Sequence, residues 1–239
     1  MKYQLVFEDT FDQNTLNRDI WTPETGGHGF GNKEAQYYTD RDMNIDLSEG
    51  YLQIKAQKET YENNAYTSAK LITFPNQLLQ YGKIEVEAIL PSGHGTWPAI
   101  WMLGQNFKEG TRWPLCGEID LLEHVGHNPG KIHFSLHTKN KNFSVGTQHT
   151  YVTTIDQPFE KKRTYGIIWK PGRITFTLDG EAVATYEKKA TDTVEDWPFD
   201  QPFYLILNVA LGGSWGGPID DDALPTTMKV FKVSYYKET

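Results

Sequence analysis

Three acidic side chains lie close together near the middle of the chain, in the segment Glu118-Ile119-Asp120-Leu121-Leu122-Glu123. Successive side chains of a β-strand point to opposite faces, so Glu118 and Asp120 would share a face and Glu123 would point away. One extra residue, a β-bulge around Leu121 and Leu122, would return Glu123 to that face. Such close carboxyls raise one another's pKa values, and glycoside hydrolysis requires one ionised carboxylate beside one protonated carboxyl.

Two simpler interpretations of this segment must be weighed against that chemistry. In a helix, Leu115, Ile119 and Leu122 would form an ordinary apolar stripe, and the acids would lie on a solvated face. A short acidic strand at the edge of a sheet would give the same pattern. The elements predicted for the rest of the chain decide between these interpretations.

Those elements are predicted to be strands. Apolar and polar residues alternate over residues 51–56 and 83–90, and residues 173–186 form a predicted hairpin around Asp179-Gly180. Residues 201–211 are continuously apolar, like a strand buried on both faces, and residues 228–236 are a predicted last strand. The 12 prolines interrupt most long helical windows. The chain is therefore predicted to be all-β, with two stacked antiparallel sheets and the acidic segment as a bulged strand.

Composition limits the class of protein. The 239 residues fit a single domain, 1–239, because no segment resembles a linker. A net charge of −8 without a basic run argues against nucleic acid as a partner, whereas a neutral polysaccharide would not be repelled. The single Cys116 excludes an intrachain disulfide. No stretch is long and apolar enough to span a membrane, and we expect a monomer that is secreted, cell-surface or periplasmic, with its signal sequence absent here.

Tryptophans surround the acidic segment. Trp97 and Trp101 would share a face of a strand, and Trp113 precedes Glu118 by five residues. Trp215 lies in a glycine-rich stretch, which favours a binding edge over the core. Sugar rings pack their C–H faces on indoles, so this arrangement suits a saccharide site, although each of the first three is equally compatible with a place in the core.

The histidines near the acids do not form a recognised zinc motif. His133 and His137 are four residues apart and would share a face of a strand, with His127 nearby. We therefore expect no metal centre. His137 is interpreted either as a hydrogen-bond partner of a catalytic acid or of the sugar, or as a structural histidine.

Taken together, these residues resemble glycoside hydrolase family 16, and within it the laminarinase-like endo-β-1,3(4)-glucanases. The resemblance covers nearly the whole chain. Its segments are residues 31–39 (GNKEAQYYT), 95–103 (GTWPAIWML), 113–123 (WPLCGEIDLLE), 133–137 and 197–208 (WPFDQPFYLILN).

The resemblance implies a β-jelly-roll sandwich with a concave substrate cleft and a retaining double-displacement mechanism. Glu118 corresponds to the nucleophile and Glu123 to the general acid/base, with Asp120 between them. Trp97, Trp101 and Trp113 would contact sugars. Asn32 would contact sugar on the non-reducing side of the cut.

The sequence departs from the family pattern in two places. Lys70 stands where relatives often carry Arg, so a bidentate sugar contact would be weakened. Many relatives also bind a structural calcium through carboxylates at positions that are Thr10 and Phe231 here. We therefore expect no calcium, and no other cofactor.

The predicted activity is endo-hydrolysis of β-1,3-glucan (laminarin), with mixed-linkage β-1,3/1,4-glucan as a further substrate. A galactan hydrolase of the agarase or porphyranase type is the nearest alternative enzyme. A non-catalytic glucan-binding protein is the alternative from another class, but such proteins lose the catalytic acids, and all three acids are present here.

Overall fold

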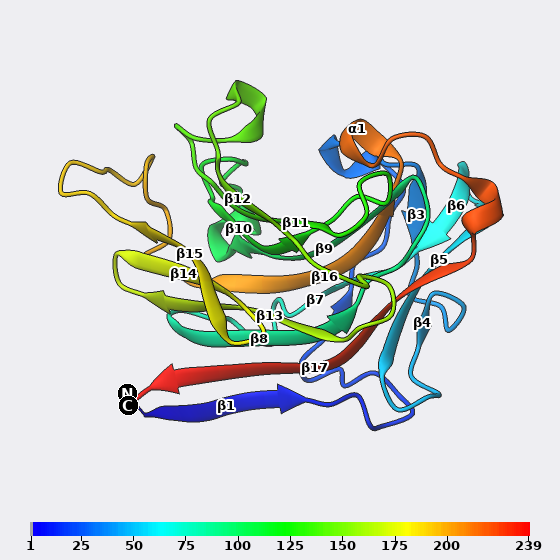
Figure 1. Cartoon of the computed structure of the whole chain (residues 1–239), viewed down its shortest axis with the longest axis horizontal. Coiled ribbons are helices and arrows are strands. Elements are labelled where there is room, and N and C mark those ends of the chain that lie inside the picture. The colour runs from blue at the N-terminus through cyan, green and yellow to red at the C-terminus, as the bar shows by residue number, and fades with distance from the viewer. Residues whose placement is uncertain (1) are drawn as a thin grey trace.

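The computed structural model describes residues 2–239 and folds them into two stacked β-sheets (Figure 1). The outer sheet has the strand order β15-β14-β13-β8-β17-β5-β6-β3, with β1 on β17 and β4 on β5. Its strands are β1 (Tyr3–Asp9), β3 (Gln36–Tyr38), β4 (Ile45–Asp46), β5 (Leu52–Tyr61), β6 (Asn64–Ser68), β8 (Gly82–Ile89), β13 (Arg163–Lys170), β14 (Arg173–Leu178), β15 (Glu181–Glu187) and β17 (Thr226–Glu238).

The inner sheet has the order β12-β11-β10-β9-β16-β7-β2. Its strands are β2 (Thr22–Pro23), β7 (Lys70–Ile72), β9 (Thr96–Gly104), β10 (Glu118–Glu123), β11 (Lys131–His137), β12 (His149–Thr154) and β16 (Phe203–Leu211). All pairings in the described chain are antiparallel except that of β3 with β6, which is parallel. The predicted all-β sandwich is confirmed.

Helical structure in residues 2–239 is confined to single turns. The α-helix α1 spans Gly213–Gly216, and 3-10 turns span Gly29–Gly31, Gln105–Phe107, Phe143–Val145 and Asp221–Ala223. None of these turns has the length or apolar character of a membrane-crossing helix. Figure 1 shows α1 and the β11–β12 connection (138–148) rising on the same side of the inner sheet.

Alternating side chains build the core between the sheets. Ile84, Val86 and Ala88 of β8 are fully buried, while the residues between them are partly exposed. The continuously apolar β16 is buried along its whole length, as predicted. In the predicted hairpin, Asp179 and Gly180 have φ values of 51° and 83°, the positive angles that a two-residue type I′ turn requires.

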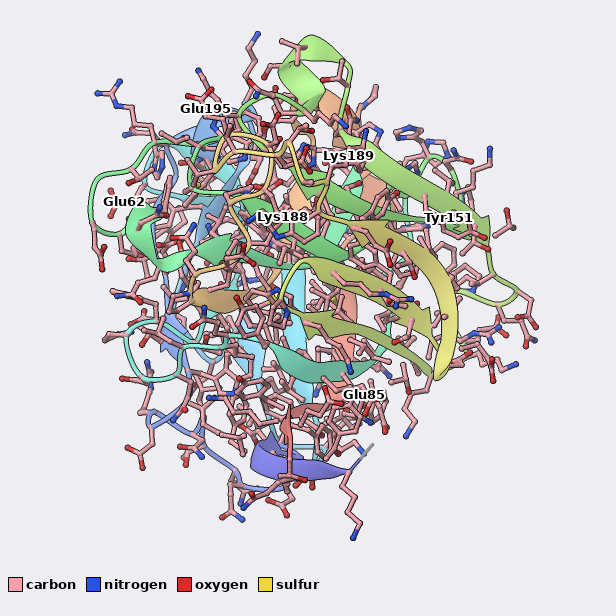
Figure 2. The ribbon with its side chains drawn as sticks, turned by 90° about the vertical axis from the view of Figure 1, so that its left-hand side faces the viewer. Glu62, Glu85, Tyr151, Lys188, Lys189 and Glu195 are labelled. Carbon is pink, nitrogen blue, oxygen red and sulfur yellow. The ribbon has the colours of Figure 1, made fainter. Side chains whose placement is uncertain are left out.

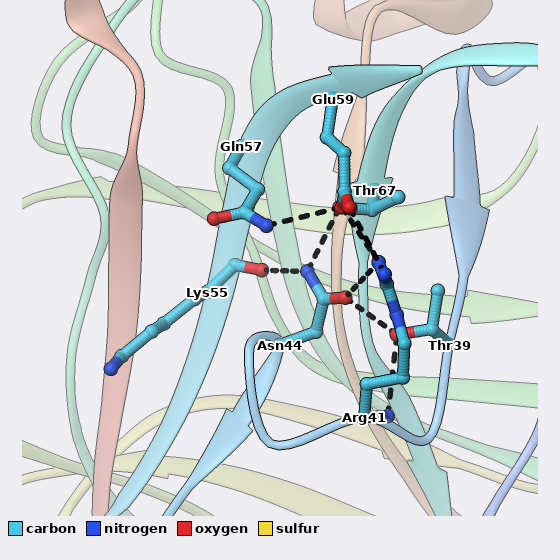
Figure 3. Close-up of polar contacts among 7 residues, drawn as sticks. All are labelled: Thr39, Arg41, Asn44, Lys55, Gln57, Glu59 and Thr67. Carbon is cyan, nitrogen blue, oxygen red and sulfur yellow. Dashed lines mark hydrogen bonds and ion pairs between the residues drawn. The ribbon is translucent and has the colours of Figure 1, made fainter. Parts of the chain in front are cut away.

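A buried polar network joins the segment after β3 to the strands β5 and β6 (Figure 3). Asn44 is fully buried and accepts a hydrogen bond from Thr39 Oγ1 at 2.5 Å. Its Nδ2 donates to the Lys55 carbonyl at 3.0 Å and to Thr67 Oγ1 at 3.1 Å. Glu59 accepts from both terminal guanidinium nitrogens of Arg41 at 3.0 and 2.6 Å. These bonds hold residues 39–44 against β5 and β6.

Replacing Asn44 with Ala should lower the free energy of unfolding by roughly 1–3 kcal/mol, because it leaves buried hydrogen-bonding groups of Thr39, Lys55 and Thr67 without their partner. Chemical denaturation measures the change. The exposed neighbour Asp42 supplies the control, since Asp42→Ala should change the stability by no more than about 0.5 kcal/mol. Equal stabilities for the two variants would contradict the role assigned to the network.

Candidate active site

The acidic segment forms the strand β10, and the predicted bulge is present. Against β9, the register shifts between Asp120 and Leu122. Against β11, Asp120 pairs with Ser135 and Glu123 with His133. An advance of three residues along β10 therefore corresponds to an advance of two residues along β11, which is one extra residue in β10. Leu121 and Leu122 are both fully buried in the core. The bulge sends two consecutive leucines into the core, and this is what returns Glu123 to the face of Glu118 and Asp120.

Close packing fixes the start of this strand. Gly117 has a φ of 78°, a conformation that glycine adopts without strain. A Cβ at this position would come within 2.7 Å of Pro198 Cγ. The preceding Cys116 is fully buried, and burial raises the pKa of its thiol to about 12, so this thiol stays protonated and unreactive.

His137 joins the acids from the neighbouring strand. Its Nε2 lies 3.2 Å from Asp120 Oδ2 and 3.6 Å from Glu118 Oε1. Asp120 and His137 are almost completely buried. The ligand atoms of Glu118, Asp120 and His137 lie within 4.8 Å of one another, a donor set that could hold a divalent cation. Sequence spacing did not indicate this set because its members come from two strands.

The other two histidines lie apart from this cluster. The rings of His133 and Trp215 are 4.8 Å apart and meet edge to face. His127 Nδ1 lies 3.2 Å from the carbonyl oxygen of Gly216 and so ties α1 to the β10–β11 connection. His127, His133 and His137, the histidines considered as site candidates, therefore lie in three separate environments.

Burial governs the protonation of the acids. It raises the pKa of Glu118 and of Asp120 well above their usual values, and the Asp120 carboxyl raises that of Glu118 further. Burial, together with Asp120, raises the pKa of Glu123 to about 8. Since three negative charges on one desolvated face repel each other, the cluster retains protons at neutral pH. It therefore contains the protonated carboxyl that the sequence pattern predicted.

Trp97 and Trp215 lie at the Glu123 end of the strand. The indole Nε1 of Trp97 donates to Glu123 Oε1 at 3.1 Å, and this bond favours the ionised form of the acid. The ring of Trp215 meets the Trp97 ring edge to face at 5.5 Å. Trp97 therefore contacts Glu123 directly, and Trp215 packs against Trp97.

Trp113 lies at the Glu118 end. Its ring packs 6.0 Å from that of His137 and 4.9 Å from that of Phe143. Its Nε1 is buried, and the N–H group lowers the pKa of Glu118 and so favours the ionised form of that acid. Phe143 was not singled out from the sequence, because only the fold of the β11–β12 connection brings it to this place.

Trp101, Asn208 and Lys70 occupy the neighbouring strands β9, β16 and β7. Trp101 Nε1 donates to Asn208 Oδ1 at 2.7 Å. The Lys70 ammonium lies 5.3 Å from the Trp101 ring and forms an ion pair with Glu24 at 2.7 Å. A second lysine, Lys108, approaches the same carboxylate at 2.5 Å, and the pKa of Glu24 falls to about 2. Sequence reasoning did not single out Glu24, the ion-pair partner of Lys70.

Asn32 belongs to a polar cluster that joins distant parts of the chain. Its Nδ2 donates to Glu34 Oε1 at 3.3 Å, and Tyr38 donates to Glu34 Oε2 at 3.1 Å. Asn208 Nδ2 in turn donates to the Tyr38 hydroxyl at 3.0 Å. The Leu211 amide donates to Gln36 Oε1 at 2.7 Å. Asn32 is thus connected to Trp101 through Glu34, Tyr38 and Asn208.

The two positions associated with calcium in relatives have other surroundings here. The ring of Phe231 packs 4.9 Å from that of Tyr51, and the Lys162 ammonium lies 5.1 Å from the Phe231 ring. Thr10 is exposed and follows β1. Neither side chain offers a carboxylate, and the absence of calcium stays a prediction.

A two-sheet sandwich with clustered carboxyls between aromatic side chains is the arrangement of a glycoside hydrolase. Residues 29–228 match the profile of Glycosyl hydrolases family 16, and the chain belongs to this family. It is 42% identical to a Beta-glucanase of Rhodothermus marinus over 98% of this chain and 85% of the relative. It is 36% identical to a Glucan endo-1,3-beta-glucosidase of Cryptopygus antarcticus, over 98% of this chain and 91% of the relative.

The solved structures agree with this assignment. The laminarinase from Rhodothermus marinus superposes with a TM-score of 0.95 at 41% identity, covering 99% of this chain and 98% of that one. The predicted β-jelly-roll fold and the predicted family are confirmed.

The raised pKa of Glu123 can be measured directly. Carboxyl ¹³C NMR of glutamate-labelled protein should show one side chain titrating near pH 8. Glu123→Gln identifies that resonance by removing it. Trp97→Phe should move its midpoint to higher pH, because the lost N–H donor favours the ionised form.

Trp101→Phe serves as the matched control for this titration, since Trp101 donates to Asn208 and not to Glu123. The midpoint of Glu123 should stay in place in that variant. A midpoint below pH 6 in the unaltered protein would disprove the proposed protonation of the cluster.

Proposed function

We propose that this family 16 glycoside hydrolase cleaves internal bonds of β-1,3-glucan and retains the anomeric configuration. Mixed-linkage β-1,3/1,4-glucan is the proposed second substrate. The observation that supports this most strongly is the bulge of β10, which gathers Glu118, Asp120 and Glu123 on one face. Retaining enzymes need two carboxyl groups roughly 5–5.5 Å apart. The names of the similar proteins, among them a Glucan endo-1,3-beta-glucosidase, favour a β-glucan substrate.

In the first step, the Glu118 carboxylate attacks the anomeric carbon while protonated Glu123 gives its proton to the departing glycosidic oxygen. The C–O bond to the leaving sugar breaks, and a glycosyl ester of Glu118 forms. In the second step, ionised Glu123 takes a proton from water, and the resulting hydroxide releases the sugar from Glu118. Both carboxyls return to their starting protonation states.

The neighbours of the two acids support this division of roles. Burial and Asp120 raise the pKa of Glu118, whereas His137 and the Trp113 N–H group lower it toward the ionised form that a nucleophile requires. Glu123, with its pKa raised to about 8, carries the proton that the leaving oxygen needs. Asp120 and His137 contact each other and lie beside Glu118, so they position the nucleophile.

The sugar-binding roles proposed from the sequence are consistent with these contacts. Trp97, Trp101, Trp113 and Trp215 offer ring surfaces, and Asn32 and Lys70 offer polar groups on the side of β7 and β16. Because Lys70 already pairs with Glu24, we propose that its ammonium helps to orient Trp101 as well as the substrate. The concave cleft that would hold the polymer stays a prediction.

We further propose that residues 1–239 form one catalytic domain that acts as a monomer outside the cytoplasm. One core cluster joins residues of both sheets, from Phe11 to Tyr235, and this supports a single folding unit. A large polysaccharide is a substrate met outside the cell. Gel filtration with light scattering measures the oligomeric state.

The substrate assignment is tested with purified protein on laminarin, lichenan and agarose, by counting new reducing ends. We expect release from laminarin and, more slowly, from lichenan, and none from agarose. Release from agarose alone would establish the galactan hydrolase instead. Binding of laminarin without new reducing ends on any polymer would establish the binding protein.

Glu118→Gln should lower kcat on laminarin by roughly 10³-fold or more, because the amide cannot form the glycosyl ester. The fold should persist, since the exchange preserves the shape of the side chain. Near-normal turnover in this variant would disprove its role as nucleophile.

Azide distinguishes the two acids by product configuration. With Glu118→Gly and an activated glucosyl donor, azide should replace the nucleophile and give a glycosyl azide of inverted configuration. With Glu123→Ala, azide should attack the ester on Glu118 and give the retained configuration. If the configurations of the two products were the reverse, Glu123 would be the nucleophile and Glu118 the general acid/base. NMR of the isolated azides reads the configuration.

A further inference from the structure

Phe143 is an exposed aromatic residue next to the catalytic acids. Its relative exposure is 51%, although its ring packs 4.9 Å from that of Trp113 with an interplanar angle of 32°. The ring of His137 meets it edge to face at 5.9 Å. Because His137 contacts Glu118 and Asp120, a single ring separates Phe143 from the reacting carboxyls. The aromatic surface of Trp113 therefore continues outward to solvent through Phe143.

A buried asparagine holds Phe143 in this position. Asn142 is only 4% exposed and accepts a hydrogen bond from the Ser144 amide at 3.0 Å. Its Nδ2 donates to the carbonyls of Thr138 and Lys139 at 3.2 and 3.1 Å. Gly146, with a φ of 66°, ends the turn. The turn Phe143–Val145 is therefore built by the loop before any ligand is bound.

The base of the loop is also anchored from outside. The Asn140 amide donates to the Glu195 carbonyl at 3.2 Å, and Asn140 Nδ2 donates to Asp196 Oδ1 at 2.8 Å. Figure 2 labels Glu195 and Lys189 on the segment that follows β15, on the side of the molecule to which the loop is attached. A loop that is fixed at its base and capped at its tip loses little conformational entropy when a ligand binds.

We propose that Trp113 and Phe143 form an aromatic platform that binds a glucosyl ring of the β-glucan beyond the two rings joined by the cleaved bond. The platform rests on the proposed glucanase function and extends it, because it makes Phe143 a residue that binds the polymer beyond the reacting sugar. Large exposed rings beside a catalytic centre leave apolar surface in water, and the C–H face of a neutral sugar removes that surface from water. The ring lies outside the reacting cluster, so its contribution is to binding.

Phe143→Ala should raise KM for laminarin roughly 3- to 10-fold, the range that aromatic contacts support. The kcat value should stay within about two-fold, because the lost contact is made equally by the ground state and the transition state. Phe143→Tyr and Phe143→Trp, which keep a ring, should retain the KM of the unaltered enzyme.

Val145→Ala is the matched control. Val145 lies on the same turn with 61% exposure, and it has no place in the platform. Its replacement should leave both constants unchanged. Thermal unfolding of both Ala variants checks that neither substitution disturbs the fold.

Chain length gives a second readout. On linear β-1,3-gluco-oligosaccharides of two to six units, the effect of Phe143→Ala on KM should be absent for the shortest cleaved substrate and should appear once the chain reaches the platform. Calorimetric titration of the same oligosaccharides into Glu118→Gln and into Glu118→Gln/Phe143→Ala measures the contact without turnover, and only the longer ones should bind more weakly to the double variant.

The results separate the two proposals. An unaltered enzyme that neither cleaves nor binds laminarin overturns the proposed function and the platform with it. An active enzyme in which Phe143→Ala behaves like Val145→Ala overturns the platform alone. An equal rise in KM at every chain length also overturns it, because that result places the effect at the reacting sugar.

Discussion

The whole site depends on the removal of three carboxyl groups from water on one face of a single strand. Ionised carboxylates are very unfavourable in such surroundings, so the cluster keeps protons that exposed acids would lose at neutral pH. What holds the acids there is apolar: the bulge is fixed because Leu121 and Leu122 are both buried in the core. Hydrophobic packing on one face of β10 thus determines how many protons the opposite face carries.

The tryptophans connect this strained electrostatic arrangement to the rest of the fold. Each indole has a large apolar body and a single N–H donor, and the three nearest ones use that donor differently. Trp97 donates to Glu123, Trp101 donates to Asn208, and the N–H group of Trp113 lowers the pKa of Glu118. Tryptophan therefore has three roles here. Trp97 lowers the pKa of Glu123, Trp101 is hydrogen-bonded to the neighbouring strand β16, and Trp113 packs against Phe143.

The sequence alone predicted the features that depend on local pattern. Alternation predicted the strands, the Asp179-Gly180 pair predicted its hairpin, and the odd spacing of Glu123 predicted the bulge. It could not predict contacts that only the fold creates. Glu24 follows β2 and pairs with Lys70 of the neighbouring strand β7, and Phe143 contacts Trp113 because Asn142 caps a turn in a polar loop. The spacing of residues along the sequence predicts neither contact.

The polar cluster around Tyr38 joins segments that are very far apart in the sequence. Asn208 binds the Tyr38 hydroxyl across 170 residues, and the Leu211 amide binds Gln36 across 175. Contacts of such separation form slowly, because a long loop must close before they contribute stability. Because β10 precedes β16 in the sequence, the strand with the three acids is synthesised well before β16, the neighbour of β9. The growing chain thus contains Glu118, Asp120 and Glu123 before the strand that binds Gln36 and Tyr38 has been made.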